Sequence, residues 1–216
     1  MTERNTEGKT ESGRLVVITG RSGSGKDVIM DQMLNERELK QLGFRKLVTH
    51  ATRAPREGEI EGYSYYFISE EEMLKMYENG ELVEPPTQTG DSLKATSKSE
   101  LLKVIDDAES LIWRIDLSRA AQIVSGDFFT SEFDPDLAKT FEACTKVFLI
   151  ESEEPVLVLR RKERDGEKYD PEQYRLRDEQ DLEVLNKFGK FFSRKIENPQ
   201  GDLDSAVKEI VKSVFE

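Results

Sequence analysis

The 216-residue sequence has a single cysteine, no long apolar run and no surplus of basic residues. The lone thiol of Cys144 cannot form a disulfide within the chain, which favours a reducing, cytoplasmic location and a role as a small packing residue. No segment approaches the ~18 apolar residues that a membrane span requires. The net charge of −12 argues against general nucleic-acid binding, because that activity requires a basic face. The composition therefore predicts a soluble chain that binds neither membranes nor nucleic acid.

Repeats and low-complexity segments are also missing, and the length suits one α/β domain with a small insertion. Residues 1–13 are polar and acidic and lack the apolar stretch of a signal peptide, so we expect a disordered tail there. Nothing in the sequence decides between a monomer and a homodimer.

The most informative stretch follows the apolar run of residues 15–18. It reads Gly20-Arg21-Ser22-Gly23-Ser24-Gly25-Lys26-Asp27. Glycines at this spacing, between a strand and a helix, are typical of a phosphate-binding loop whose backbone N–H groups surround a polyphosphate. Lys26 would reach the β- and γ-phosphates. The alternative is a glycine turn without a ligand, and a strand and a helix in the right register disfavour it.

The remaining segments alternate between strand-like and helix-like patterns. We expect further strands at residues 44–49, 63–68, 81–84, 111–116, 146–150 and 196–198. We expect helices over residues 28–39, 117–124 and 156–164, after Ser69, near Ser99, after Asp170, and at the amphipathic C-terminus. Residues 87–95 are predicted to be a loop, and residues 125–139 have no clear pattern. Strands separated by helices predict parallel βαβ units, with ligands bound beyond the carboxyl ends of the strands.

Two later segments carry a resemblance to a known family. They are Thr49-His50-Ala51-Thr52-Arg53-Ala54-Pro55-Arg56 and Gly62-Tyr63-Ser64-Tyr65-Tyr66-Phe67. Together with the phosphate loop they resemble the guanylate kinases, whose pattern is a hydroxyl residue, Thr-Arg-x-Pro-Arg and then Gly-x-x-Tyr-x-Phe. The likeness runs from about Leu15 to the C-terminus. It implies a three-layer P-loop NTPase core (residues 14–48, 100–159 and 181–216), an acceptor-nucleotide insertion (49–99) and a helical lid (160–180).

The resemblance also implies the residues of an acceptor site for GMP. Arg53, Arg56 and Tyr65 match residues that hold the acceptor phosphate, and guanidinium forks suit that task. Glu84 and Asp116 match two carboxylates that accept hydrogen bonds from guanine, with Thr49 in the place of a base-contacting serine. The alternatives are a solvated basic patch for the arginines and an ordinary loop acid for Glu84.

On the donor side, the resemblance implies that ATP binds the phosphate loop and Asn198. Arg160, Arg164 and Arg175 match the lid arginines that close over the transferred phosphoryl group. Such arginines matter because phosphoryl transfer depends on positioning and charge neutralisation. For Arg160 the alternative is a cation that complements the C-terminal dipole of its helix.

Three departures from the family pattern concern the acceptor pocket and the metal. Residues 91–97 replace a tyrosine-containing segment, and Lys94 could substitute there as a point charge. Asp27 stands where the family has a hydroxyl that binds Mg²⁺, and Arg114 replaces the first carboxylate of an Asp-x-Asp strand end. We hypothesise that Asp27 and Arg114 form an ion pair, because an unpaired cation inside a parallel sheet is costly. Asp27 would then either ligate Mg²⁺ itself or leave the metal position filled by the pair.

The resemblance implies a Mg²⁺-dependent kinase that converts ATP and GMP to ADP and GDP. One alternative is a kinase for another nucleoside monophosphate, since Pro85 and Pro86 alter the rim of the base pocket. The other alternative is a catalytically weak module of the same fold that binds a nucleotide or a protein partner. Lys26 and the lid arginines favour the enzyme, and Asp27 and Arg114 favour the module.

Overall fold

The computed structural model describes residues 12–89 and 91–216. Most of the tail predicted at residues 1–13 therefore lies outside the described residues. The chain divides into two compact units. The larger unit comprises residues 15–46 and 111–216, and the smaller one comprises residues 47–110 with the short segment that precedes residue 15. The predicted insertion, residues 49–99, lies within the smaller unit.

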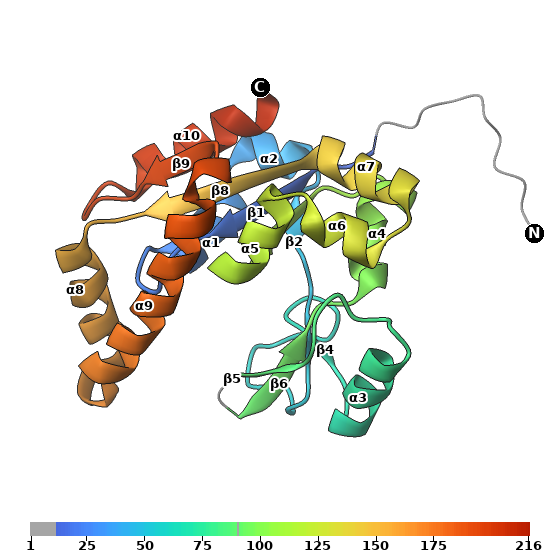
Figure 1. Ribbon diagram of the computed structural model, residues 1–216, viewed down its shortest axis with the longest axis horizontal. Coiled ribbons are helices and arrows are strands. Elements are labelled where there is room, and N and C mark those ends of the chain that lie inside the picture. Colours follow the sequence, from blue (N-terminus) through green and yellow to red (C-terminus); the bar gives the residue numbers. More distant parts are fainter. Residues whose placement is uncertain (1–11, 90) are drawn as a thin grey trace, which may run out of the picture. The chain divides into compact units, whose positions relative to one another are not determined.

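A five-stranded parallel sheet forms the centre of the larger unit, in the order β2-β7-β1-β8-β9 (Figure 1). Its strands are β1 (Leu15–Thr19), β2 (Arg45–Lys46), β7 (Leu111–Arg114), β8 (Thr145–Glu151) and β9 (Arg194–Glu197). Every residue of the central strand β1 is buried, as expected for a parallel strand covered on both faces. The predicted fold class, an α/β protein with a parallel sheet, is confirmed.

Helices cover this sheet. They are α1 (Lys26–Met33), α2 (Arg37–Gln41), α5 (Leu117–Val124), α6 (Asp127–Glu132), α7 (Pro135–Cys144), α8 (Glu154–Asp165), α9 (Pro171–Phe188) and α10 (Leu203–Phe215), with 3₁₀ turns η1 (Gly166–Lys168) and η2 (Gly189–Phe191). The amphipathic C-terminal helix is confirmed, because α10 buries its apolar face in one cluster with residues of α1 and the sheet. Val207 and Ile210 of that face are completely buried.

The single helix predicted over residues 28–39 is wrong, since the structure divides it into α1 and α2. The chain turns at Asn35, whose backbone N–H donates to the Gln32 carbonyl. The Asn35 side chain also donates to the Asp31 carbonyl. An asparagine side chain that binds the backbone of the preceding turn competes with helix propagation, which explains the break.

The unassigned segment after residue 125 forms α6 and α7, and its aromatic residues build a core beside β7. Phe128 and Phe129 are buried, and the ring of Phe129 stacks on Phe141 with centroids 4.9 Å apart. The rings of Phe128 and Trp113 of β7 have centroids 5.7 Å apart. Burial at the end of α7 raises the pKa of the Cys144 thiol to about 11, as suits a packing residue.

The smaller unit contains a four-stranded sheet in the order β4-β3-β6-β5. Its elements are β3 (His50–Ala51), β4 (Tyr66–Phe67), α3 (Glu70–Glu78), β5 (Thr87–Thr89), β6 (Ser92–Ala95) and α4 (Lys98–Asp106). The loop predicted at residues 87–95 is wrong, because β5 and β6 pair as an antiparallel hairpin. The strand predicted at residues 81–84 is also wrong, since only Leu82 forms a bridge there, to Ser97.

Both helices of the smaller unit begin at a serine. Ser69 and Glu72 form the predicted capping box at the start of α3. The cap of α4 is Ser97, two positions before the predicted start. Among the described residues, no helix is long and apolar enough to cross a membrane.

Candidate functional site

The glycine loop between β1 and α1 needs its glycines for both conformation and space. Gly20, Gly23 and Gly25 have φ values of 149°, 84° and 90°. A Cβ on Gly20 would lie 2.3 Å from the Ile150 carbonyl oxygen, and one on Gly25 would lie 2.4 Å from the Asn198 side chain. The loop can therefore present backbone N–H groups and the N-terminus of α1 to an anion, as a phosphate site requires.

Lys26 lies at the start of α1 and folds back over this loop. Its Nζ donates to the carbonyl oxygens of Gly20 at 2.7 Å and Arg21 at 2.9 Å. Burial lowers the pKa of Lys26 to about 8, and Asp27 opposes this shift. A buried ammonium held by neutral carbonyls would gain strongly from a nearby phosphate, since charge interactions strengthen away from water.

Two side chains support the loop backbone from the end of β9 and from α8. Asn198 is buried, and its Nδ2 donates to the Ser24 carbonyl at 2.8 Å. Arg160 donates to the carbonyls of Gly23 at 3.4 Å and Pro199 at 3.0 Å. The structure thus brings both predicted residues to the phosphate loop, where they hold its backbone.

A second arginine of α8, which the sequence did not single out, anchors the loop more firmly. Arg161 is 1% exposed, and its Nε donates to the Ser22 carbonyl at 2.9 Å. Its two terminal nitrogens donate to the carboxylate of Asp178 on α9, at 2.7 and 2.8 Å. Arg21 of the loop binds the same carboxylate at 2.9 Å and Glu154 at 2.6 Å. Asp178 therefore links α8, α9 and the phosphate loop.

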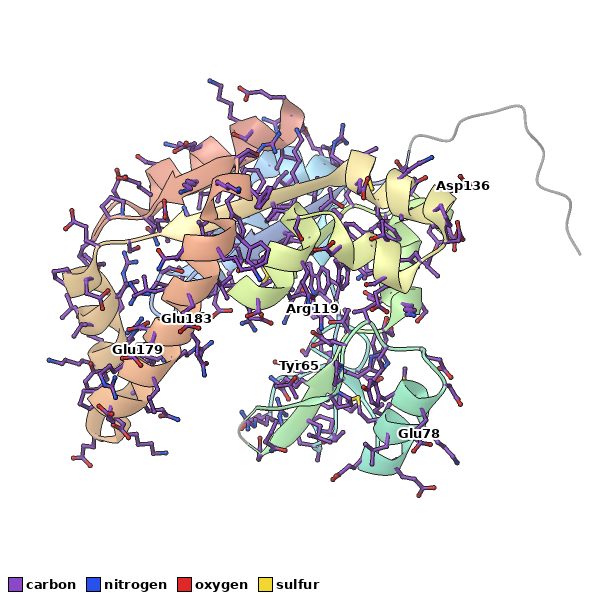
Figure 2. The ribbon with its side chains drawn as sticks, viewed as in Figure 1. Tyr65, Glu78, Arg119, Asp136, Glu179 and Glu183 are labelled. Carbon is purple, nitrogen blue, oxygen red and sulfur yellow. The ribbon has the colours of Figure 1, made fainter. Side chains whose placement is uncertain are left out.

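The other two predicted lid arginines bind carboxylates of the lid itself. Arg164 pairs with Asp165 at 2.8 Å and contacts Tyr174. Arg175 pairs with Glu172 and with Glu179, which Figure 2 labels on α9. Both arginine side chains are more than half exposed in these positions. They lie on α8 and α9, and their part in lid closure stays a prediction.

The hypothesised ion pair is present, since Arg114 Nε lies 2.7 Å from Asp27 Oδ1. The reason given for it was wrong. Arg114 is the last residue of β7 and its side chain is 42% exposed, so it is not enclosed within the sheet. The pair lies at the carboxyl end of the strands, where Arg114 is in register with Ile18 of β1.

In the smaller unit, two predicted phosphate-binding arginines are held by carboxylates. Both terminal nitrogens of Arg53 donate to Glu59 at 2.6 Å. Arg56 donates to Asp91 at 3.0 and 3.1 Å. The hydrogen bond from Arg53 lowers the pKa of Glu59 to about 2. The guanidinium forks are thus already arranged around anionic oxygens, as they would be around a phosphate.

Tyr65 and Lys94 complete this cationic cluster. Lys94 Nζ lies 2.9 Å from the Tyr65 hydroxyl oxygen, and the Arg53 guanidinium lies 5.3 Å from the centroid of the Tyr65 ring. Figure 2 labels Tyr65 within the smaller unit. Lys94 of β6 therefore lies beside Tyr65, and its role as a substitute for the missing tyrosine stays a prediction.

The predicted base-recognition residues fall in both units. In the smaller one, Glu84 Oε1 accepts from the backbone N–H of Thr96 at 3.2 Å, and the Thr49 carbonyl accepts from Tyr66 at 3.0 Å. Asp116 belongs to the larger unit and caps α5, where its Oδ1 accepts from the Arg119 backbone N–H at 2.9 Å. Their roles toward a base stay predictions.

The sequence alone gives little indication that Arg161 and Asp178 form an ion pair. Arg161 lies within a basic run next to Arg160, and Asp178 lies seventeen positions later on another helix. Asp178 does not belong to any recognisable sequence motif. Only the proximity of α8 and α9 identifies the pair.

A parallel sheet whose first strand leads through a glycine loop to a helix with Lys26 over the loop defines a P-loop nucleotide-binding protein. A sequence model of the family described as guanylate kinase matches residues 12–130. The chain therefore belongs to the guanylate kinase family, which confirms the resemblance seen in its motifs.

Individual relatives agree with this assignment. The chain is 34% identical over 113 residues to the guanylate kinase of Clostridioides difficile (strain 630), a match covering 52% of this chain and 53% of that protein. It is 29% identical over 199 residues to guanylate kinase 2, chloroplastic/mitochondrial, of Oryza sativa subsp. japonica, covering 91% of this chain and 61% of the relative. The matches thus span between half and two thirds of these relatives' lengths.

A solved structure shares the fold. The crystal structure of guanylate kinase from Anaplasma phagocytophilum superposes with a TM-score of 0.59 at 18% identity, covering 95% of this chain and 86% of that one. At this identity the likeness concerns the fold alone.

Proposed function

We propose that this chain transfers the γ-phosphoryl group of ATP to GMP, giving ADP and GDP. The observation that supports this most is the occurrence of a cationic cluster in each unit, each of which we propose as a phosphate site. One is the phosphate loop with Lys26, and the other is the cluster of Arg53, Arg56, Tyr65 and Lys94. A phosphotransferase needs two such sites, because it must neutralise and align both the donor and the acceptor phosphates.

On the donor side, the loop backbone and Lys26 bind the β- and γ-phosphates of ATP. Asn198, Arg160 and Arg161 act on the loop by fixing its carbonyls, so its N–H groups are aligned before the nucleotide arrives. Arg164 and Arg175 would exchange their carboxylate partners for phosphate oxygens when the lid closes.

On the acceptor side, the GMP phosphate replaces Glu59 and Asp91 on the two guanidinium forks. Glu84 of the smaller unit and Asp116 of the larger unit are each proposed to accept a hydrogen bond from guanine, and Thr49 is proposed as a further contact to the base. Adenine does not offer a ring N–H and an exocyclic amine side by side, so a carboxylate selects guanine. A cytoplasmic location and a monomeric or homodimeric state stay predictions.

The family resemblance implies Mg²⁺, and the chain's own residues do not form a site that fits it. Asp27, the candidate ligand, has its Oδ1 bound to Arg114. The described residues contain no group of three or more His, Cys, Asp or Glu side chains that could hold a metal. We therefore assign no step to a metal held by the protein, and any Mg²⁺ enters as part of the MgATP substrate.

Release of ADP from MgATP tests the function, measured with GMP, dGMP, AMP, CMP, UMP and dTMP as acceptors. We expect turnover with GMP to exceed that with the other bases, and Lys26→Met to lower it by about 10²–10³-fold. Lys208→Met on the exposed face of α10 is the matched control and should be unchanged. Turnover with a different base would keep the kinase and reject the guanine assignments. Binding of ATP or GMP without any turnover would favour the catalytically weak module.

A further inference from the structure

We propose that the Asp27–Arg114 ion pair stands in the place of the hydroxyl that binds Mg²⁺ in other phosphate loops. Its guanidinium then supplies a fixed positive charge to the bound polyphosphate, and the chain without nucleotide has no divalent-cation site there. This inference deepens the proposed function, because it names how that same site neutralises its ligand. The polyphosphate part rests on the proposed function, whereas the metal part is a property of the chain alone.

The two residues come from the elements that flank the loop. Asp27 is the second residue of α1, directly after Lys26. Arg114 ends β7, which is the parallel neighbour of β1, the strand that enters the loop. Their side chains are 67% and 42% exposed, so a ligand entering from solvent can reach both.

The chemistry of Asp27 explains why the pair excludes a metal. A P-loop commonly has serine or threonine at this position, and the hydroxyl binds Mg²⁺. Mg²⁺ requires near-octahedral oxygen coordination, and Asp27 offers one carboxylate that already accepts from a guanidinium at 2.7 Å. A metal bound at Asp27 would have to share that carboxylate with the Arg114 guanidinium, so it would meet a positive charge 2.7 Å from Oδ1. No group of three or more acids, cysteines or imidazoles among the described residues supplies further protein ligands.

The charged residues around the loop also disfavour the binding of a divalent cation. The charged groups that act on the Lys26 ammonium are Asp27, Arg114, Arg177 and Asp181. Lys26, Arg114 and Arg177 thus place three cations at this end of the loop, near the two carboxylates. A divalent cation would enter a field that is already positive, whereas a polyphosphate anion would be attracted by it.

The first test uses the full-length chain and Mn²⁺ alone, without nucleotide, and follows free Mn²⁺ by electron paramagnetic resonance. Arg114→Ala should raise Mn²⁺ affinity about tenfold or more, since it frees Asp27 and removes a cation. Adding Asp27→Asn to that variant should abolish the gain. Arg37→Ala removes an exposed arginine of α2 and is the matched control, with no expected change. Wild-type binding that Asp27→Asn removes would overturn the inference, and so would an Arg114→Ala variant without the gain.

The second test measures a non-hydrolysable ATP analogue in the presence of EDTA. Arg114→Ala should weaken this metal-free binding about tenfold, Arg114→Lys should restore part of it, and Arg37→Ala should leave it unchanged. Equal affinity of wild type and Arg114→Ala would overturn the charge role. If the wild-type chain bound no ATP analogue under any condition, the proposed function would fail, while the Mn²⁺ titration would still decide the nature of the ion pair.

Discussion

The two units hold the side chains of their candidate sites in different ways. In the larger unit, Arg161 and Asn198 are buried and donate to backbone carbonyls of the phosphate loop. In the smaller unit, Arg53 donates to the side chain of Glu59, and Arg56 donates to the side chain of Asp91. A backbone carbonyl cannot leave its loop, whereas a carboxylate side chain can rotate away. The proposed donor site is thus fixed by the fold, and the proposed acceptor site is held by carboxylates that a phosphate would displace.

The largest expected effect comes from removing the cation of the fixed site. Lys26→Met should lower kcat with GMP by about 10²–10³-fold, because a preorganised charge at the transferred phosphoryl group is lost. The control Lys208→Met should retain full activity. A Lys26→Met variant with near wild-type kcat would show that the loop does not bind the reacting phosphates.

The second effect concerns the stability of the fixed site. Asp178→Ala leaves the buried Arg161 guanidinium without its carboxylate, so the free energy of unfolding should fall by about 3 kcal/mol. Urea denaturation measures this change. Glu172→Ala removes the exposed partner of Arg175 and should cost less than about 1 kcal/mol. Equal losses in the two variants would contradict the distinction between buried and exposed pairs.

A pH profile follows from the pKa of about 8 that burial gives Lys26. The ammonium is present below this pH and is lost above it, so kcat/KM for ATP should fall about tenfold per pH unit above pH 8. Lys26→Arg, whose cation does not titrate in this range, should lack that fall at whatever activity it retains. A wild-type profile that stays level to pH 10 would exclude Lys26 as the titrating group.

The smallest effect tests the displaceable site. Glu59→Gln removes the anion that competes for Arg53, so GMP should bind about threefold more tightly while the ATP analogue binds unchanged. Glu57→Gln, at an exposed position two residues earlier, is the matched control. Weaker GMP binding in Glu59→Gln would mean that Glu59 positions Arg53 for the acceptor and does not compete with it. Calorimetric titration distinguishes the two outcomes.

The sequence predicts those parts of this molecule that depend on local spacing. The phosphate loop, the capping box at Ser69 and the apolar face of α10 each lie within one short segment. The Asp27–Arg114 pair was also predictable, because a strand end and a helix start meet at the loop. The hairpin at residues 87–95 was missed because its strands are short and mostly polar.

Contacts between distant helices could not be predicted in the same way. Asp178 binds Arg161, seventeen positions away, and Arg21, 157 positions away, and neither spacing is a recognisable motif. The partners of the predicted lid arginines are likewise determined by how α8 and α9 pack. The sequence therefore identifies candidate arginines. Only the tertiary structure shows which of them binds the backbone of the phosphate loop.

The central claim is that each unit carries its own phosphate site, and paired calorimetric titrations test it most directly. The wild type, Lys26→Met and Arg53→Ala are each titrated with a non-hydrolysable ATP analogue and with GMP. We predict that Lys26→Met loses the ATP analogue and keeps GMP, whereas Arg53→Ala loses GMP and keeps the ATP analogue. Loss of both ligands in either variant, while the fold is intact by circular dichroism, would contradict two separately built sites.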